Sequence, residues 1–561
     1  MNILGISCYY HDSAACLIKD GKVAAAAHEE RFSRIKHDED FPINAINYCL
    51  SEGGISIEDV DYIGFYEKPI LKFDRVLSQY LETFPRSFGM FIKTMPSWLT
   101  EKLKVPSIIR KKLKYEGDIL FIEHHLAHAA SAYMVSPFKK AAILTIDAIG
   151  EWTSTSLGLG EGNEITLLKE IRFPHSIGLF YSTITAYLGF RVNNDEYKVM
   201  GLSAYGKPTY YERFKEIIDI KEDGSFRLDM SYFDYHRRFQ MPSKKFTEEF
   251  GSARIPESKI EQKHMDIAAS LQKITEEILF KMLNHLYDLT KTDNLCMAGG
   301  VALNSVANGK ITKNTPFKKV YVQPASTDAG TSMGVAFFIH NSILGKDRKY
   351  VLNSAFLGPS FSEDQIREFL DKNNIPYQEF KDDKDLARKT AELIHKDKII
   401  GWFQGRMEWG PRALGNRSIL ANPCNPNTKD ILNRKVKHRE WFRPFAPVVP
   451  LEDAKRYFDT DMPVPYMTMV YPVKEEKRKF LPSITHVDGS GRLQTIERER
   501  NSLYYDVIRE FEKLSGFPVV INTSFNVRGE PIVCSPEDAY NCFKGTGIDH
   551  LVMGKFLISK I

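Results

Sequence analysis

Residues 143–162 read ILTIDAIGEWTSTSLGLGEG, and residues 3–22 read ILGISCYYHDSAACLIKDGK. A shift of 140 residues aligns the two stretches without a gap and places Leu144 over Leu4 and Leu157 over Leu17. In each stretch an apolar strand pattern is followed by a polar turn and a second strand pattern. This internal repeat predicts an α/β fold with two similar halves that face each other across a cleft. A chance match of two strand–turn–strand patterns is the alternative interpretation.

The composition limits the class of protein. A chain of 561 residues with 43% hydrophobic and 26% charged residues is typical of a globular protein with more than one core. Its net charge of +4 lacks the large basic excess of a nucleic-acid binder, so we expect small anionic substrates and no nucleic-acid partner. The seven cysteines form no C-x-x-C pair, and the start of the chain does not resemble a signal peptide. We therefore expect a cytoplasmic protein with no membrane partner, and the sequence does not predict its oligomeric state.

Polar, loop-rich sequence between about 350 and 385 indicates a joint between domains. We expect a first domain at residues 1–350, a connecting segment at 351–380 and a second domain at 381–561. Residues 68–115 are typical of amphipathic basic helices inserted into the first domain. An ordinary packed insertion is the preferred interpretation, and a role at a membrane surface is the alternative.

Two histidines of the segment HHLAHAASAY (124–133) stand one helical turn apart. His124 and His128 would project from the same side of a helix, where two imidazoles can bind one metal ion. Asp147 and Asp328 follow or end predicted strands, and such positions face the ligand cleft of an open α/β fold. Two imidazoles and two carboxylates would suit Fe(II), Mn(II) or Zn(II), and the donor set does not rank these ions. A structural or surface role is the alternative for the histidine pair.

Small and polar residues at the ends of strands indicate a nucleotide cleft. The segment AGGVALN (298–304) places Gly299 and Gly300 between a strand and a helix and ends at Asn304, and glycines there let a phosphate approach the backbone. A tight turn without a ligand is the alternative. His11 and Asp12 occupy the first hairpin turn, where either side chain could accept a proton from an incoming hydroxyl group.

Basic residues are concentrated in the second domain. Between positions 406 and 443 the chain carries, among others, Arg406, Arg412, Arg417, Arg434, Lys435, Lys437, Arg439 and Arg443. Because they alternate with Gly, Pro, Phe and Trp instead of forming a helical stripe, they predict a pocket for phosphate groups, with a solvated basic face as the alternative.

Several long motifs carry a family resemblance. They are GISCYYHDSAACLIKDGKVAAAAHEERFSRIKHD (5–38), HHLAHAASAY (124–133), TIDAIGEWTSTS (145–156), EYKVMGLSAYGKP (196–208) and MAGGVALNS (297–305). The chain resembles, nearly from end to end, the O-carbamoyltransferases of the nodulation and antibiotic-tailoring type. This resemblance implies a Kae1-like first domain with the ASKHA (actin-like) fold and an α+β, YrdC-like second domain. It also implies an iron-type ion at His124, His128, Asp147 and Asp328, and a transfer site that includes Lys198.

The same resemblance implies the chemistry. The second domain would form carbamoyl adenylate and pyrophosphate from carbamoyl phosphate and ATP, with Mg(II). The first domain would then transfer the carbamoyl group to a hydroxyl of a small-molecule acceptor. The residues implied to bind ATP and carbamoyl phosphate are Arg412, Lys437, Arg439, Arg443, Arg492, Asn522, Ser524 and Arg528.

Other functions compete with this one. A small-molecule kinase would need only the ASKHA cleft, and it would leave the arginine-rich domain unexplained. A tRNA threonylcarbamoyl-transfer protein would need a broad basic surface, which a net charge of +4 does not favour. A non-catalytic nucleotide sensor would not need the full set of potential metal ligands.

Overall fold

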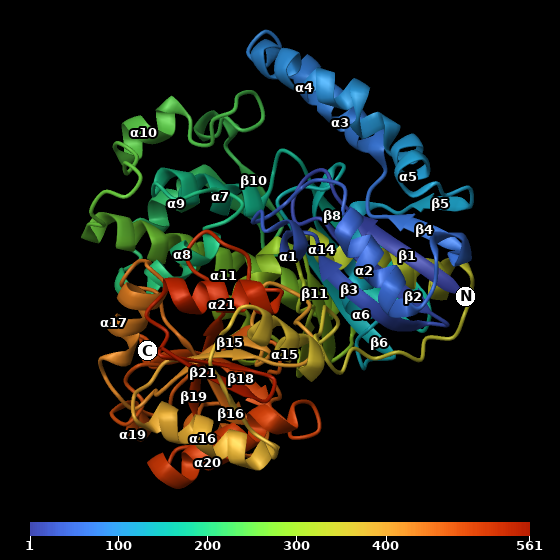
Figure 1. The fold of residues 1–561 in the computed structure, drawn as a ribbon. Helices are drawn as coiled ribbons and strands as arrows, with labels where there is room; N and C mark the ends of the chain where they lie inside the picture. The colour runs from blue at the N-terminus through green and yellow to red at the C-terminus, as the bar shows by residue number, and fades with distance from the viewer. Residues whose placement is uncertain (561) are drawn as a thin grey trace. The chain divides into compact units, whose positions relative to one another are not determined.

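A computed structural model describes residues 1–560, which form two compact units. The first unit contains residues 1–29, 37–307 and 311–352, and the second contains residues 30–36, 308–310 and the chain from Asn353 onward. Figure 1 shows the ribbon of both units. Two short segments therefore belong to the second unit although they lie within the sequence of the first. Arg34, for example, donates hydrogen bonds to the carbonyls of Pro531 and Ile532.

The first unit contains a five-stranded sheet within residues 2–121, in the order β3-β2-β1-β4-β5. Strands β1, β2 and β3 are antiparallel, whereas β4 and β5 run parallel to β1. The strands are β1 (Asn2–Ser7), β2 (Ala14–Lys19), β3 (Lys22–His28), β4 (Tyr62–Phe65) and β5 (Asp118–Phe121).

A second sheet, within residues 140–322, repeats this arrangement in the order β8-β7-β6-β11-β12. Its strands are β6 (Lys140–Ile146), β7 (Thr153–Glu161), β8 (Glu164–Arg172), β11 (Asn294–Ala298) and β12 (Lys319–Val322). Leu4 pairs with Leu17 in the first sheet, and Leu144 pairs with Leu157 in the second. The shift of 140 residues therefore preserves the strand register, and the predicted duplicated α/β fold is confirmed.

Helix α14 (Asp328–Phe337) packs closely on helix α6 (His124–Tyr133) and on β1. A Cβ atom on Gly334 of α14 would lie 2.0 Å from the carbonyl oxygen of Ala127 in α6. A Cβ atom on Gly5 of β1 would lie 1.8 Å from the carbonyl oxygen of Ser332. Glycine at both positions therefore allows α14 to approach its neighbours. The other helices of this unit include α2 (Ile43–Gly53), α7 (Ile177–Tyr187), α8 (Glu196–Leu202), α9 (Tyr211–Ile217), α10 (Lys244–Phe250) and α11 (Gln262–Thr290).

Residues 68–115 form helices, as the sequence predicts. They are α3 (Pro69–Glu82), α4 (Phe88–Thr100) and α5 (Val105–Leu113). In Figure 1 the α3–α4 pair extends away from the two sheets of the first unit. Among the helices of residues 1–560, none combines the length and the apolar content that crossing a bilayer requires.

The second unit is built on a nine-stranded mixed sheet within residues 378–559, in the order β13-β21-β20-β14-β15-β19-β16-β18-β17. Its strands are β13 (Gln378–Glu379), β14 (Ile400–Phe403), β15 (Arg417–Ala421), β16 (Ala446–Pro450), β17 (Met469–Pro472), β18 (Ser490–Ile496), β19 (Val520–Ser524), β20 (His550–Met553) and β21 (Phe556–Ser559). Helices α16 (Asp383–His395) and α20 (Ser502–Ser515) pack with Trp402, Val448 and Val520 of the sheet in one buried core.

The segment predicted as a connector contains a helix, α15 (Glu363–Lys372). A capping box begins it, because Ser362 and Gln365 each accept a hydrogen bond from the other's backbone N–H. This local signal, Ser-x-x-Gln, was present in the sequence. The remaining helices of this unit include α17 (Thr428–Ile431), α18 (Ala454–Tyr457), α19 (Glu475–Arg478) and α21 (Pro536–Gly545).

Candidate functional site

The predicted metal ligands converge in the first unit. Helix α6 carries His124 and His128 on one side, Asp147 follows β6, and Asp328 begins α14. One ligand atom of each residue lies within 4.8 Å of those of the other three, and all four residues are buried. The His124 Nε2 atom is 3.1 Å from Asp147 Oδ2, and His128 Nε2 is 3.5 Å from Asp328 Oδ1. We call these four residues the His–Asp cluster.

The backbone around the His–Asp cluster orients its ligands. Asp147 accepts a hydrogen bond through Oδ1 from the backbone N–H of Gly300, at 3.0 Å, so that Oδ2 faces the histidines. The carboxylate of Glu151 accepts from the backbone N–H of His124 at the start of α6, which fixes that end of the helix. Gly299 has a φ of +93°, and a Cβ atom there would lie 2.2 Å from the Ile146 carbonyl oxygen. Such supporting contacts hold metal ligands in place in known metal sites.

The chemistry of the His–Asp cluster fits a divalent cation. The Nε2 atoms of His124 and His128 are 3.1 Å apart, and in the tautomer with the proton on Nδ1 both would direct a lone pair toward a shared cation. Among residues 1–560, the buried Oδ2 atom of Asp328 has no hydrogen-bond partner. Burial alone raises the pKa of Asp147, but hydrogen bonds from the two histidines hold it well below its usual range. By contrast, His125 contacts Thr145 Oγ1 through Nδ1, at 2.6 Å, and is not a member of the cluster.

A second group of titratable residues lies in the same unit and comprises His11, Asp12 and His37. The Nδ1 atom of His11 is 3.0 Å from Asp12 Oδ2, and the Nδ1 atom of His37 is 2.7 Å from Asp12 Oδ1. The other ring nitrogens reach the 193–194 loop, at the Asn193 carbonyl (2.6 Å) and at Asn194 Oδ1 (2.8 Å). The sequence predicted roles for His11 and Asp12 but missed His37. We call these three residues the Asp12 group.

The backbone and the charges of the Asp12 group are unusual. Asp12 and His37 both have positive φ angles, 52° and 55°, and strained conformations of this kind concentrate at functional sites. Burial lowers the pKa of His11, but the adjacent Asp12 carboxylate outweighs it and raises the pKa to about 10. Asp328 also contributes to this increase, so the Asp12 group lies within electrostatic reach of the His–Asp cluster. At neutral pH His11 is therefore a cation and Asp12 a carboxylate.

Lys198 is buried in α8, and its Nζ atom lies 3.0 Å from Asp195 Oδ2. The adjacent Glu196 accepts hydrogen bonds from Ser182 and from the backbone N–H of Asn193. Lys198 is thus a buried residue that closely follows Asn193 and Asn194, the two residues that contact the Asp12 group.

Asn304, a predicted nucleotide-binding residue, has its amide engaged elsewhere. It exchanges two hydrogen bonds with Gln272 of α11, at 3.0 and 3.1 Å, and accepts a third from the Ala307 N–H. These contacts tie the turn after Gly300 to α11.

In the second unit, Lys437 and Ser524 are brought together although 87 residues separate them. The buried ammonium group of Lys437 donates to the Ser524 carbonyl at 2.7 Å and to Asn526 Oδ1 at 2.7 Å. Ser524 Oγ is 3.2 Å from the same ammonium group. This pair places a cation and a hydroxyl at the end of β19.

Arg492 and Asn522 share one face of the sheet with Ser524. Side chains two residues apart in a strand point the same way, so Arg492 aligns with Gln494 in β18, and Asn522 with Ser524 in β19. Asn522 donates to Gln494 Oε1 at 2.7 Å across β16, which shows that the two pairs lie on the same face.

The loop that contains Arg412 is fixed over this sheet. Three strand side chains donate to its backbone carbonyls: Asn522 to Ala413, Gln494 to Leu414 and Trp402 to Gly415. The Glu408 carboxylate accepts in turn from three backbone N–H groups of residues 414–417. Arg412 is therefore held by a rigid loop near the predicted pocket.

The other predicted arginines of this unit lie around Glu440. Arg443 and Arg528 approach its carboxylate at 3.5 and 3.8 Å, whereas Arg439 donates to Asn433 Oδ1 at 2.7 Å.

The assignment of Arg406 and Arg417 to the anion pocket needs correction. Both donate to backbone carbonyls between Leu357 and Pro359, and Arg417 is fully buried. Charge density in the sequence does not distinguish such structural arginines from ligand-binding ones.

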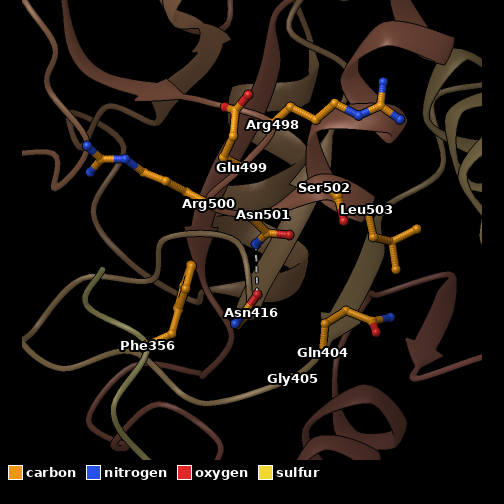
Figure 2. A pocket seen from close by; sticks show the side chains of 10 residues that line it. All are labelled: Phe356, Gln404, Gly405, Asn416, Arg498, Glu499, Arg500, Asn501, Ser502 and Leu503. Atoms are coloured by element: carbon orange, nitrogen blue, oxygen red, sulfur yellow. Dashed lines mark hydrogen bonds between the residues drawn. The ribbon is translucent and has the colours of Figure 1, made fainter. Parts of the chain in front are cut away.

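A separate cavity of about 600 Å³ opens in the second unit. Figure 2 shows its lining, in which the amides of Asn416 and Asn501 are joined by a hydrogen bond of 2.9 Å. Phe356, Gln404 and Arg500 line it as well. The lining contains none of the residues predicted to bind ATP or carbamoyl phosphate.

Comparisons with known proteins extend over both units. Family models described as Carbamoyltransferase N-terminus and Carbamoyltransferase C-terminus match residues 2–337 and 391–560. The protein sll1178 of Synechocystis sp. (strain ATCC 27184 / PCC 6803 / Kazusa) is 47% identical over 594 residues, which cover 100% of this chain and 97% of that protein. Nodulation protein NolNO of Sinorhizobium fredii (strain NBRC 101917 / NGR234) is 38% identical over 566 residues, which cover 98% of this chain and 79% of that protein.

Among solved structures, HypF of T. kodakarensis aligns with 61% of this chain and 48% of its own, with 13% identity and a TM-score of 0.34. The family models carry the assignment, because the first of them alone spans more than half of the chain. The protein belongs to the carbamoyltransferase family and is a transferase.

Proposed function

We propose that the protein is an ATP-dependent O-carbamoyltransferase that works in two steps. In the first, the second unit converts carbamoyl phosphate and ATP to carbamoyl adenylate. Water releases phosphate from carbamoyl phosphate, and the resulting carbamate oxygen attacks the α-phosphorus of ATP and displaces pyrophosphate. In the second, the first unit transfers the carbamoyl group to a hydroxyl of a small molecule, such as a sugar or a natural product, and AMP leaves.

The observation that carries this proposal is the proximity of the His–Asp cluster and the Asp12 group within one unit. The four ligands would hold a divalent cation, Fe(II), Mn(II) or Zn(II), which supplies positive charge for an oxygen of the donor. Asp12 is the carboxylate available to accept the acceptor's proton, since His11 is protonated at neutral pH. His37 orients Asp12 through the 2.7 Å contact and links it to Asn194.

The glycine turn beside the His–Asp cluster supports nucleotide binding in the first unit. The Gly300 N–H already holds Asp147, so a phosphate at this turn would lie next to the ligands. Lys198 is a further candidate for the transfer site. We assign Gly299, Gly300 and Asn304 to this nucleotide site, with Asn304 supporting the turn through α11.

In the second unit, Arg492 and Ser524 lie on one face of the sheet, and Lys437 contacts Ser524. Together with the Arg412 loop, these residues support binding of two phosphate-bearing substrates. Guanidinium and ammonium groups neutralise their charge and align the reacting groups, which lowers the barrier to adenylation. Arg439, Arg443 and Arg528 extend this basic surface, and Asn522 positions the loop.

A product assay tests the proposed function. The full-length protein is incubated with carbamoyl phosphate, ATP, Mg(II) and a panel of hydroxyl compounds, and the products are analysed by mass spectrometry. We expect an acceptor that gains one carbamoyl group, together with pyrophosphate and AMP, and only when both substrates are present. Formation of ADP and a phosphorylated acceptor would instead identify a kinase, and carbamoylation without ATP would contradict the adenylate route.

A further inference from the structure

Backbone hydrogen bonds join the two segments that form the Asp12 group. The Tyr9 N–H donates to the Glu39 carbonyl at 2.7 Å, and the Ser13 N–H donates to the Asp38 carbonyl at 2.9 Å. These two contacts hold the turn that carries His11 and Asp12 against the segment that carries His37. The side chains of the Asp12 group are therefore brought together by the backbone and not only by their own contacts.

The loop at residues 193–194 fixes which ring nitrogen carries the proton. His11 Nε2 lies 2.6 Å from the Asn193 carbonyl oxygen, and His37 Nε2 lies 2.8 Å from Asn194 Oδ1. The amide nitrogen of Asn194 donates to Asp195 Oδ1 at 3.0 Å, which turns the amide oxygen toward His37. Because both acceptors are oxygens without a hydrogen, each Nε2 atom must be the donor. In a neutral ring, the Nδ1 atom then presents a lone pair.

Both Nδ1 atoms face the Asp12 carboxylate, which only accepts hydrogen bonds. The distances are 3.0 Å from His11 Nδ1 to Oδ2 and 2.7 Å from His37 Nδ1 to Oδ1. A lone pair on either Nδ1 atom would meet a carboxylate lone pair. A second proton on both rings removes this conflict but stacks two cations, because the ring centroids are 4.6 Å apart and the planes differ by 27°. One cation shared by the three residues removes both conflicts.

The donor atoms of the Asp12 group suit zinc. Two imidazoles and one carboxylate each offer a ligand atom, and these atoms lie within 4.8 Å of one another. Three such ligands leave the fourth tetrahedral position open. The other nitrogen of each ring is bound by an oxygen, as it is for histidine ligands in known metal sites. The ion must displace any proton on the Nδ1 atoms, which favours Zn(II), with its affinity for imidazole, over Mg(II).

We propose that the Asp12 group is a second divalent-cation site, which binds Zn(II) through His11 Nδ1, His37 Nδ1 and a carboxylate oxygen of Asp12. It shares no residue with the His–Asp cluster. Zinc at this site occupies the carboxylate that would accept the acceptor's proton, so the bound ion inhibits the transfer step. This inhibitory role rests on the proposed function, whereas zinc binding itself does not.

The zinc content of the full-length protein tests the site. Metal-free protein is dialysed to equilibrium against Zn(II), and bound zinc is measured by inductively coupled plasma mass spectrometry. Wild type should bind about two ions per chain, and His37→Asn and His128→Asn should each bind about one. Asparagine tolerates the positive φ of residue 37, and circular dichroism checks the fold of each variant. His395→Asn, which changes an exposed histidine of α16, is the control and should bind as wild type.

Two results would overturn the site. They are equal zinc content in wild type and His37→Asn, and a single ion in wild type that only His128→Asn removes.

A zinc titration of the transfer assay tests the inhibitory role. Zn(II) should stop formation of the carbamoylated acceptor in wild type, and the residual transfer by His37→Asn should need roughly tenfold more zinc for half inhibition. Equal inhibition of the two proteins would overturn this role. If no carbamoylated acceptor forms even without zinc, the proposed function fails, and the zinc content still decides the site.

Discussion

His128 and His125 lie on the same helix, but their ring nitrogens meet different partners. His128 Nε2 faces two aspartates, whereas His125 Nδ1 contacts Thr145. We predict that His128→Asn, which removes the Nε2 ligand atom, lowers the affinity for the proposed divalent ion roughly 100-fold. His125→Asn keeps a donor near Thr145 and is the control. Metal content after dialysis, measured by inductively coupled plasma mass spectrometry, should fall in the first variant alone, and equal content in both would exclude the cluster as the metal site.

Lys437 is the cation with the most direct contact to a predicted substrate-binding residue, Ser524. Lys437→Met keeps the length of the side chain but removes its charge, and we expect carbamoyl-phosphate-dependent ATP–pyrophosphate exchange to fall about 100-fold or more, as for a lost transition-state contact. Lys455→Met changes an exposed lysine of α18, outside the basic cluster, and should exchange like wild type. An unchanged rate in Lys437→Met would remove Lys437 from the adenylation site.

His11 gives the stability of the protein a pH dependence. In the folded state burial lowers the pKa of His11, but the Asp12 carboxylate outweighs this effect and raises the pKa from 6.5 to about 10. The stabilisation is therefore complete below pH 6.5 and is lost as the pH rises toward 10. We predict that the difference in unfolding free energy between wild type and His11→Gln shrinks over this range in urea titrations. A difference that is independent of pH would contradict the ion pair.

Single residues also show how far the sequence allowed prediction. The pairing of His124 with His128 follows from helical spacing, and the approach of Asp147 follows from its place at a strand end. His37 escaped prediction because its partner Asp12 is 25 residues away and its φ of 55° leaves no local pattern. The structural role of Arg417 was equally hidden, since its backbone acceptors come from distant loops.

At the scale of elements, helices α6 and α14 hold three of the four residues of the His–Asp cluster and touch through Gly334. A methyl group there would meet the Ala127 carbonyl at 2.0 Å, so Gly334→Ala must move α14 and with it Asp328. We predict a loss of about 1–3 kcal/mol of unfolding free energy and weaker metal binding, although no ligand is changed.

Gly89→Ala is the control for this prediction, because a Cβ atom on Gly89 of α4 meets nothing within 4 Å. It should stabilise the protein by about 0.5–1 kcal/mol in the same urea titration. Full metal content and stability in Gly334→Ala would show that the two helices do not need this close approach.

The strand hairpins were predictable for a physical reason. Each hairpin consists of two apolar strands joined by a polar turn, a pattern that neighbouring residues carry. The repeat also preserves the pairing of Leu4 with Leu17 and of Leu144 with Leu157. Helix α15 was not predicted, because the polar composition of its segment indicated a loop despite the capping box at Ser362.

At the scale of the molecule, the chain forms two units that do not follow the sequence order strictly. Residues 30–36 and 308–310 join the second unit although both lie within the sequence of the first. A division made along the sequence cannot detect such exchanges, because they depend on contacts such as Arg31 with the Gly410 carbonyl, 379 residues apart.

The most direct test of the two-step account is to assay both steps in His128→Asn of the full-length chain. The account predicts that carbamoyl-phosphate-dependent ATP–pyrophosphate exchange continues at nearly the wild-type rate, while the carbamoylated acceptor is no longer formed. Wild-type yields of carbamoylated acceptor from this variant, or loss of both steps in a variant that is still folded, would contradict it.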